Sequence, residues 1–180
     1  MANVRGVSET DKQSDVKILN QALFFEHRGV WAYGAAGSKL SNSEVGRAVR
    51  AIGEENRADH QKHQDLLRHA IADLGGAPIP MEDSYDLSSF IQKGHGNLDS
   101  DVNIAKLALA LEIGAAAGYV TDATHLKSPE MIELEAGIAC VEAIHVGRIR
   151  IAFNDLGIKL PVVPNPLLNA SSRGDWVIKV

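Results

Sequence analysis

The chain has 180 residues, of which 45% are apolar. This length and this apolar fraction are those of one globular domain that can bury a sizeable core. The net charge of −5 is mild and the basic residues form no stripe, so the composition gives no support to nucleic acid or an anionic membrane as a partner. We therefore expect small soluble partners.

The first residues, MANVRGVSETDKQSD, lack the apolar core of a signal peptide, and no apolar run comes near the roughly 18 residues that span a bilayer. These features predict a cytoplasmic protein. Cys140 is the only cysteine, which excludes an intrachain disulfide and an iron module built from Cys-x-x-Cys pairs. Electrons for any redox chemistry must then come from an external donor. We expect Cys140 itself to be a small buried residue.

The first half of the chain predicts two long helices. Residues 1–12 are polar and are expected to be loose, and a helix follows over about 15–37. Ser41 and Glu44 form a capping-box pattern, which predicts a second helix over about 43–74. Both helices have an apolar stripe at the helical period, so both should face a common core.

The second half predicts another helix pair after a long connection. Residues 77–100 are rich in Pro, Ser, Asp and Gly and should form a crossover with one short helical turn at 87–92. An alanine-rich third helix is expected over about 101–125. Ser128 is the expected cap of a fourth helix, which begins with a proline in its first turn and ends near Gly157.

These elements predict an all-α fold, a four-helix bundle with a single long crossover between the second and third helices. The bundle should cover about 15–157 within one domain of residues 1–180. Residues 158–180 contain three prolines and are expected to be an extended tail, packed along the bundle or onto a neighbouring subunit.

The two halves of the sequence repeat one another. The segment ALFFEHRGVWAY at 22–33 overlays ALALEIGAAAGY at 108–119 at a shift of 86 residues. A shift of 82 residues lays Asp-Leu-Gly at 73–75 onto Asp-Leu-Gly at 155–157. Such a repeat predicts a pseudo-twofold axis across the bundle that brings the centres of all four helices to one level.

Polar residues lie at the centres of these apolar stripes. Glu142 and His145 are three residues apart on one helix, so both side chains project from one face and can bind one metal ion. Buried carboxylates without partners are costly, so convergence of such residues favours a metal site over three unpaired charges. The six residues that should converge are Glu26, His60, His63, Glu112, Glu142 and His145.

With this pattern the sequence resembles the ferritin-like superfamily, in particular the rubrerythrins and the bacterial ferritin-like domains of desiccation-related proteins. That family takes one Glu from each of two helices and a Glu-x-x-His motif from each of the others. The resemblance makes Glu26 and Glu112 the single glutamates. Glu142 matches one paired motif together with the histidine three residues on, whereas the second helix has His60 where the family has a glutamate, followed by His63.

The resemblance implies an iron site with one or two ions that reacts with oxygen or peroxide. We also expect the chain to form a homodimer. Manganese or zinc is compatible with the same mixture of imidazole and carboxylate. Two divalent ions against three glutamates leave an excess charge of +1, because His60 removes one carboxylate. Glu135 also faces inward but lies about 10 Å along the helix from Glu142, so we expect it to support the site without binding metal.

Other interpretations remain open. The histidine in place of a glutamate is compatible with a non-catalytic scaffold or stress-related protein whose metal site is degenerate. Iron storage in a cage has little support, because the predicted tail differs from the short fifth helix of such cages. Tyr33 and Tyr119 lie two turns from Glu26 and Glu112 and could hydrogen-bond into the site or simply pack in the core. The remaining four histidines are expected at the surface: His27, His69, His95 and His125.

Overall fold

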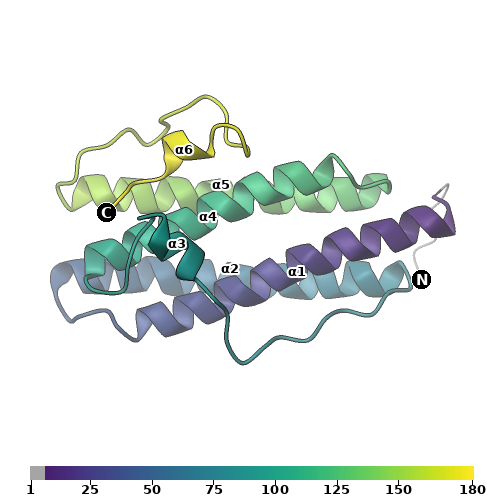
Figure 1. The fold of residues 1–180 in the computed structure, drawn as a ribbon, viewed down its shortest axis with the longest axis horizontal. Helices are drawn as coiled ribbons and strands as arrows, with labels where there is room; N and C mark the ends of the chain where they lie inside the picture. The colour runs from purple at the N-terminus through teal and green to yellow at the C-terminus, as the bar shows by residue number, and fades with distance from the viewer. Residues whose placement is uncertain (1–6) are drawn as a thin grey trace.

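The computed structural model describes residues 7–180, and every regular element in that part of the chain is a helix (Figure 1). Four long helices form an antiparallel bundle, which confirms the predicted fold class. A short helix lies in the crossover, as predicted, and another lies in the C-terminal segment. The elements are α1 (Glu9–Gly37), α2 (Glu44–Asp73), α3 (Ser88–Gln92), α4 (Asp101–Ala123), α5 (Pro129–Asp155) and α6 (Arg173–Trp176).

The first helix begins earlier than the sequence analysis predicts. The hydroxyl oxygen of Ser8 accepts a hydrogen bond from the backbone N–H of Asp11, so the cap lies in the segment expected to be loose. The helix therefore starts at Glu9, and the other part of the expected loose segment, residues 1–6, lies outside the described residues. Acidic Glu9 and Asp11 also favour this start, since they lie at the positive end of the helix dipole.

The cap of α2 differs from the capping-box prediction, although the helix begins where expected. Ser43 is the cap, and its hydroxyl accepts a hydrogen bond from the N–H of Gly46. Ser41 instead donates through its own N–H and hydroxyl to Asp101, the first residue of α4. This carboxylate also accepts from Ser43, so it ties the α1–α2 connection to the start of α4.

The repeated Asp-Leu-Gly segments end α2 and α5 in the same way. Gly75 has φ 81° and Gly157 has φ 87°, the left-handed conformation that glycine adopts without strain. After the first turn the N–H of Gly76 bonds the carbonyl of Ile71, and after the second the N–H of Ile158 bonds the carbonyl of Phe153. The internal repeat of the sequence is therefore a repeat of structure.

The start of α5 is capped from a distant helix. Ser128 occupies the expected cap position, but its side chain makes no cap hydrogen bond. Buried Asp15 on α1 instead accepts hydrogen bonds from the backbone N–H groups of Lys127 and Ser128, at 2.9 and 2.8 Å. The carboxylate thus binds the first turn of α5 to α1.

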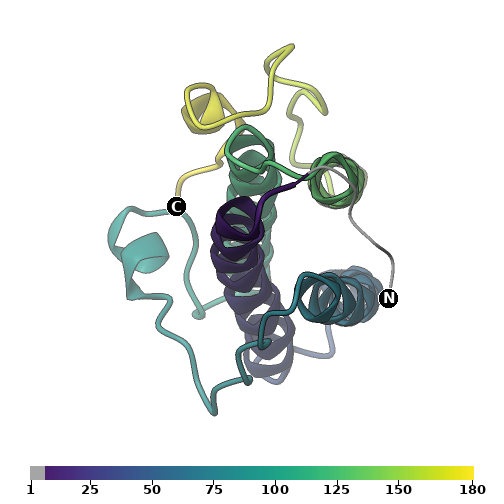
Figure 2. The same ribbon diagram turned by 90° about the vertical axis from the view of Figure 1, so that its right-hand side faces the viewer.

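The bundle consists of two helix pairs, with α1 packed mainly on α2 and α4 mainly on α5 (Figure 2). Among the described residues the core has three apolar clusters, one of them between α1, α4 and the crossover, and the other two toward opposite ends of the bundle. Of these two, one lies toward the start of α1 and includes Leu23, Leu67 and Ile138, and the other lies toward the end of α5 and includes Ile113 and Phe153. The helix centres between these two clusters carry the polar residues described below.

The C-terminal segment packs along the bundle, as one of the two predicted alternatives, but it contains a short helix where the sequence analysis predicted an extended chain. Figure 1 shows it lying over α4 and α5 with the short helix α6. Buried Arg150 donates to the carbonyls of Pro161 and Trp176, and the Trp176 indole N–H donates to the carbonyl of Leu167. Trp176 also joins the apolar cluster on α4 and α5, so the segment completes the core.

One helix among the described residues, α4, is long and apolar enough by length and composition to cross a membrane, which the sequence analysis did not anticipate. In the bundle, 56% of its most apolar window is buried against other parts of the chain. Burial of this extent is expected for the core helix of a bundle, which must be apolar on several faces.

Candidate metal centre

The structure brings all six predicted site residues together at the middle of the bundle. Each is buried, and they form two overlapping groups of four whose potential ligand atoms lie within 4.8 Å of one another. His60 and Glu142 belong to both groups. The first group adds Glu26 and His63, and the second adds Glu112 and His145. Helical periodicity together with the internal repeat predicted this convergence, and the role of the residues as metal ligands stays a prediction.

The first group joins α1, α2 and α5. Oε2 of Glu26 lies 2.7 Å from Nδ1 of His60 and 3.6 Å from Nδ1 of His63. The Nδ1 of His63 also lies 3.0 Å from Oε1 of Glu142. Four side chains from three helices therefore direct nitrogen and oxygen atoms toward one small volume.

The second group joins α2, α4 and α5. Nδ1 of His145 lies 3.3 Å from Oε2 of Glu112 and 3.5 Å from Oε2 of Glu142. The other ring nitrogen of His60, Nε2, lies 3.4 Å from Oε1 of Glu112. His60 thus directs one nitrogen to each group, and Glu142 directs one oxygen to each.

The donor set fits a metal ion, because several of its atoms converge without bonding to one another. Both carboxylate oxygens of Glu142 and Nδ1 of His63 are buried and have no hydrogen-bond partner. Nδ1 of His63 and Oε1 of Glu142 lie 3.0 Å apart, but the two atoms are not aligned as a hydrogen bond. Buried polar atoms in this state are costly, and a shared cation would satisfy all three of them at once.

The cluster also shifts the pKa values of its members in opposite directions. Burial alone would lower the pKa of the histidines, but the facing carboxylates raise it to about 9 for His63 and about 10 for His145, and well above the ordinary value for His60. Burial would raise the pKa of Glu26, yet the neighbouring histidines lower it to about 2. Without metal, the histidines are therefore protonated at neutral pH and balance the carboxylates.

Two tyrosines hold the single glutamates in a crossed arrangement. The hydroxyl of Tyr119 on α4 donates to Oε1 of Glu26 on α1, and the hydroxyl of Tyr33 on α1 donates to Oε1 of Glu112 on α4. Of the two roles considered for these tyrosines, the structure supports the hydrogen bond into the site. Burial and the adjacent carboxylates raise the pKa of both phenols well above 10, so both remain donors.

Three further residues position the cluster, and the sequence analysis assigned none of them to the site. The side-chain amide of Asn56 donates to Oε1 of Glu112 at 3.1 Å and to the Tyr33 hydroxyl at 3.0 Å. Arg148 in turn donates to the amide oxygen of Asn56 at 3.0 Å. Asp59 lies 3.3 Å from Nε2 of His145. Asn56 lies one helical turn before His60 on the inward stripe, and this position is the feature of the sequence that could have identified it. No comparable signal marks Asp59, which is only partly buried.

Two expectations about neighbouring residues are wrong. His27 is buried instead of exposed, because Arg68 from α2 reaches across it and places Nη2 3.1 Å from its Nε2. Cys140 is exposed instead of buried. His69 and His125 are exposed as predicted, and His95 is half-buried.

Glu135 lies inward as predicted, but it contacts none of the six site residues through a hydrogen bond. Its carboxylate is buried, and neither oxygen has a hydrogen-bond partner. Burial, with smaller contributions from Asp122 and Asp15, raises the pKa of Glu135 to about 8. The side chain is therefore mainly protonated at neutral pH, which makes it a weak ligand for a cation.

The fold is shared with several solved structures of low sequence identity. A conserved hypothetical protein from Mycobacterium tuberculosis superposes with a TM-score of 0.66 at 19% identity, covering 88% of this chain and 100% of that one. A dodecameric thioferritin, the bacterioferritin-related protein of Bacteroides fragilis, gives 0.65 at 18%, covering 81% and 88%. A ferritin-like diiron-carboxylate protein from Bacillus anthracis gives 0.65 at 16%, covering 83% and 98%.

The sequence itself matches a family model over almost the whole bundle. No curated protein matches the chain significantly. The model of the ferritin-like domain, however, matches residues 14–155, from the first part of α1 to the end of α5. This range contains all six residues of the cluster, and it is the range that the resemblance predicted. The chain therefore belongs to the ferritin-like domain family.

Proposed function

We propose that the protein is a ferritin-like metal protein that binds iron at the six-residue cluster and reacts with oxygen or peroxide. The observation that supports this most is the pair of overlapping donor groups that share His60 and Glu142. Glu142, whose two oxygens have no hydrogen-bond partner, would then serve both groups. Manganese and zinc are alternative metals for this mixture of donors.

The residues would divide their roles by position. Glu26 and His63 would hold one ion, Glu112 and His145 would hold the other, and Glu142 would lie between them. Bound iron would supply the one-electron chemistry that lets the centre reduce a small oxidant. Tyr33 and Tyr119 keep the two outer carboxylates oriented through their hydroxyl groups, because a buried carboxylate that accepts a fixed hydrogen bond loses rotational freedom.

A shallow groove on the surface gives a small oxidant a route toward this cluster. It lies between α2 and α5 and is lined mainly by apolar side chains such as Leu66 and Val141. His63 also lines it, although its side chain is only 6% exposed. Gly137 has no side chain, so the α5 wall of the groove does not project there. Molecules the size of oxygen or peroxide would reach His63 here, and larger reductants would stay outside and transfer electrons from the surface.

The descriptions of two solved neighbours support the proposal that the protein is a ferritin-like metal protein. One solved neighbour is described as a ferritin-like diiron-carboxylate protein and another as a dodecameric thioferritin. We propose accordingly that this chain is also an oligomer in the cytoplasm, with a homodimer as the smallest unit, and that it takes electrons from an external donor. Light scattering on the purified protein would distinguish a dimer from a cage.

Metal analysis tests the proposal directly. Protein purified without chelator should contain iron, with at least one and fewer than two ions per chain after reconstitution, because the two donor groups share only three carboxylates. Glu142→Gln should lose most of this metal and the accompanying consumption of oxygen or peroxide. Asp155→Asn, at the exposed end of the same helix, is the matched control and should keep both. Absence of iron, manganese and zinc, with no binding on reconstitution, would overturn the proposal.

One observation favours a second candidate, a non-catalytic scaffold with a degenerate site. The three histidines and three glutamates can neutralise one another without any ion, and His60 makes a 2.7 Å contact with Glu26 that a glutamate at that position would not make. This candidate predicts that Glu26→Gln together with Glu112→Gln changes the melting temperature by the same amount with and without added metal. A large metal-dependent loss of melting temperature in that double variant would exclude it.

A further inference from the structure

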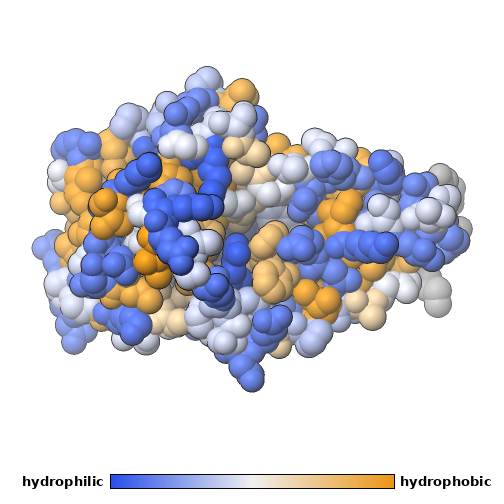
Figure 3. All heavy atoms as spheres, viewed as in Figure 1, coloured by the Kyte–Doolittle hydropathy of each residue, from blue (hydrophilic) through white to orange (hydrophobic). Residues whose placement is uncertain are grey.

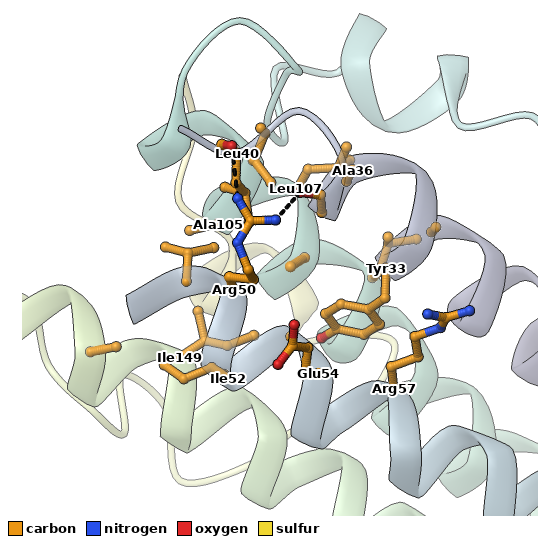
Figure 4. Close-up of a pocket in the computed structure, with 18 of the residues that line it drawn as sticks. Tyr33, Ala36, Leu40, Arg50, Ile52, Glu54, Arg57, Ala105, Leu107 and Ile149 are labelled. Carbon is orange, nitrogen blue, oxygen red and sulfur yellow. Dashed lines mark hydrogen bonds between the residues drawn. The ribbon is translucent and has the colours of Figure 1, made fainter. Parts of the chain in front are cut away.

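A cavity of about 270 Å³ lies inside the bundle, beyond the polar cluster toward the α1–α2 connection (Figure 4). All four long helices line it, and its walls are mainly apolar. On the face shown in Figure 3, apolar residues also gather toward this end of the molecule. The apolar wall includes Leu40, Val49, Ile52, Leu107, Ile149 and Phe153.

The cavity is elongated along the bundle. On α4 its lining extends from Val102 to Leu111, roughly 13 Å at about 1.5 Å per residue. A compact void would contact only one turn of each helix, whereas this one follows more than two turns. Its shape therefore suits a chain-like molecule better than a single ring.

Charged side chains reach the cavity only from α2. Arg50 donates to the carbonyls of Gly37 and Leu40, at 2.7 and 2.8 Å, so its guanidinium is already used to cap the end of α1 (Figure 4). Glu54 and Arg57 are exposed and lie at the α2 edge of the lining. The inner part of the cavity therefore offers apolar contact, and its edge offers charges of both signs.

Tyr33 separates the cavity from the polar cluster. Its ring lines the cavity, and its hydroxyl donates to Glu112 on the other side. Gly53 on α2 leaves room for this ring, since a Cβ at that position would lie 3.2 Å from its Cδ1. A molecule in the cavity would therefore contact the side chain that orients a glutamate of the site.

We propose that this cavity binds a medium-chain aliphatic molecule with a single polar head group at the α2 edge. An apolar cavity of about 150 Å³ already binds benzene and stays dry when empty, so a cavity of 270 Å³ with apolar walls accommodates a longer hydrocarbon. Binding would bury the chain between the two helix pairs and leave the head group near Glu54 and Arg57. The inference concerns the cavity and does not depend on the metal.

Calorimetric titration of the full-length protein with decanoate, below its micelle concentration, tests this inference. We expect binding of one molecule per chain and a rise in melting temperature, with and without bound metal. Ala152→Phe places a ring inside the cavity from α5 and should weaken binding about tenfold or more. Ala136→Phe, on the exposed face of the same helix, should bind decanoate as the unmodified protein does.

A second cavity-filling variant keeps the test usable if the first variant fails to fold. Ala108→Phe fills the cavity from α4, and circular dichroism shows which of the two variants keeps its helices. Absence of decanoate binding to the unmodified protein, or binding that both folded filling variants retain, would overturn the inference. Metal content measured on the same samples separates this result from the proposed function.

Discussion

The hydroxyl of Tyr119 on α4 donates a hydrogen bond to Oε1 of Glu26 on α1. Its counterpart in the internal repeat, Tyr33, does the same for Glu112, so each tyrosine serves the glutamate of the opposite helix. The two halves are nevertheless unequal. Glu112 also accepts a hydrogen bond from Asn56, whereas the residue that matches Asn56 in the repeat is the apolar Ile138.

This inequality predicts that Tyr119→Phe is more harmful than Tyr33→Phe. Loss of a hydrogen bond to a buried carboxylate costs about 1.5–3 kcal/mol, and we expect Tyr119→Phe to fall in that range. For Tyr33→Phe we expect about 1 kcal/mol, because Asn56 remains as a donor to the same oxygen. Denaturant unfolding of the two metal-free variants measures the difference. Equal losses would show that Asn56 does not stabilise Glu112.

The second prediction concerns His60, which stands where the family has a glutamate. His60→Ala should lower metal affinity or stoichiometry, because His60 faces both donor groups. His60→Glu restores the fourth carboxylate and the charge balance of two divalent ions, so it should raise occupancy by a second ion and the rate with oxygen or peroxide. Metal analysis and oxidant consumption are the measurements. Unchanged stoichiometry in both variants would place His60 outside the site.

The third prediction concerns Glu135, whose buried carboxyl has no hydrogen-bond partner. Its pKa is about 8 in the folded protein and 4.5 ordinarily, so the unfolded chain ionises first as pH rises. Ionisation of this residue therefore lowers stability progressively as pH rises from 4.5 to 8, leaves it lowered at higher pH, and has no effect at lower pH. Glu135→Gln should be more stable than the unmodified protein at pH 8, by a few kcal/mol at most.

The comparison at two pH values makes this test specific. At pH 4 both proteins carry a neutral side chain at this position and should unfold alike. Glu133→Gln, exposed on the same helix, should change stability at neither pH. A gain from Glu135→Gln that is equal at pH 4 and pH 8 would mean that ionisation of Glu135 is not the cause.

The fourth prediction is the pH dependence of the metal-free protein. The raised pKa values of His63 and His145, about 9 and 10, stabilise the fold fully below pH 6.5, and this contribution is lost as pH rises through 9 and 10. The lowered pKa of Glu26, about 2, gives stability that is present above pH 4.5 and is lost toward pH 2. The melting temperature of chelator-treated protein should thus be highest between pH 4.5 and 6.5 and should fall at higher and at lower pH.

The affinity for metal should depend on the protonation of the same histidines. A metal must displace the protons of the histidines, so binding should release protons and weaken as pH falls below 9. Calorimetry in two buffers with different ionisation enthalpies counts the protons released. Binding that releases no protons would show that the histidines are neutral in the metal-free protein.

The sequence by itself determined the fold and the residues of the cluster. Helical periodicity depends on local geometry, so the inward positions of Glu26, His60 and Glu142 follow from their spacing alone. The matching ends of α2 and α5 are equally local, since Gly75 and Gly157 adopt the same left-handed conformation. The internal repeat then related the two helix pairs and placed all six residues at one level.

The tertiary structure alone decided the contacts between helices that share no sequence signal. Asp15 caps α5 from α1, Arg68 covers His27, and Asp59 approaches His145, because the packing of the helices brings together residues that lie far apart in the sequence. The cavity beside Tyr33 depends on how the four long helices pack at one end of the bundle. This arrangement is set by packing between distant segments, which no local pattern records.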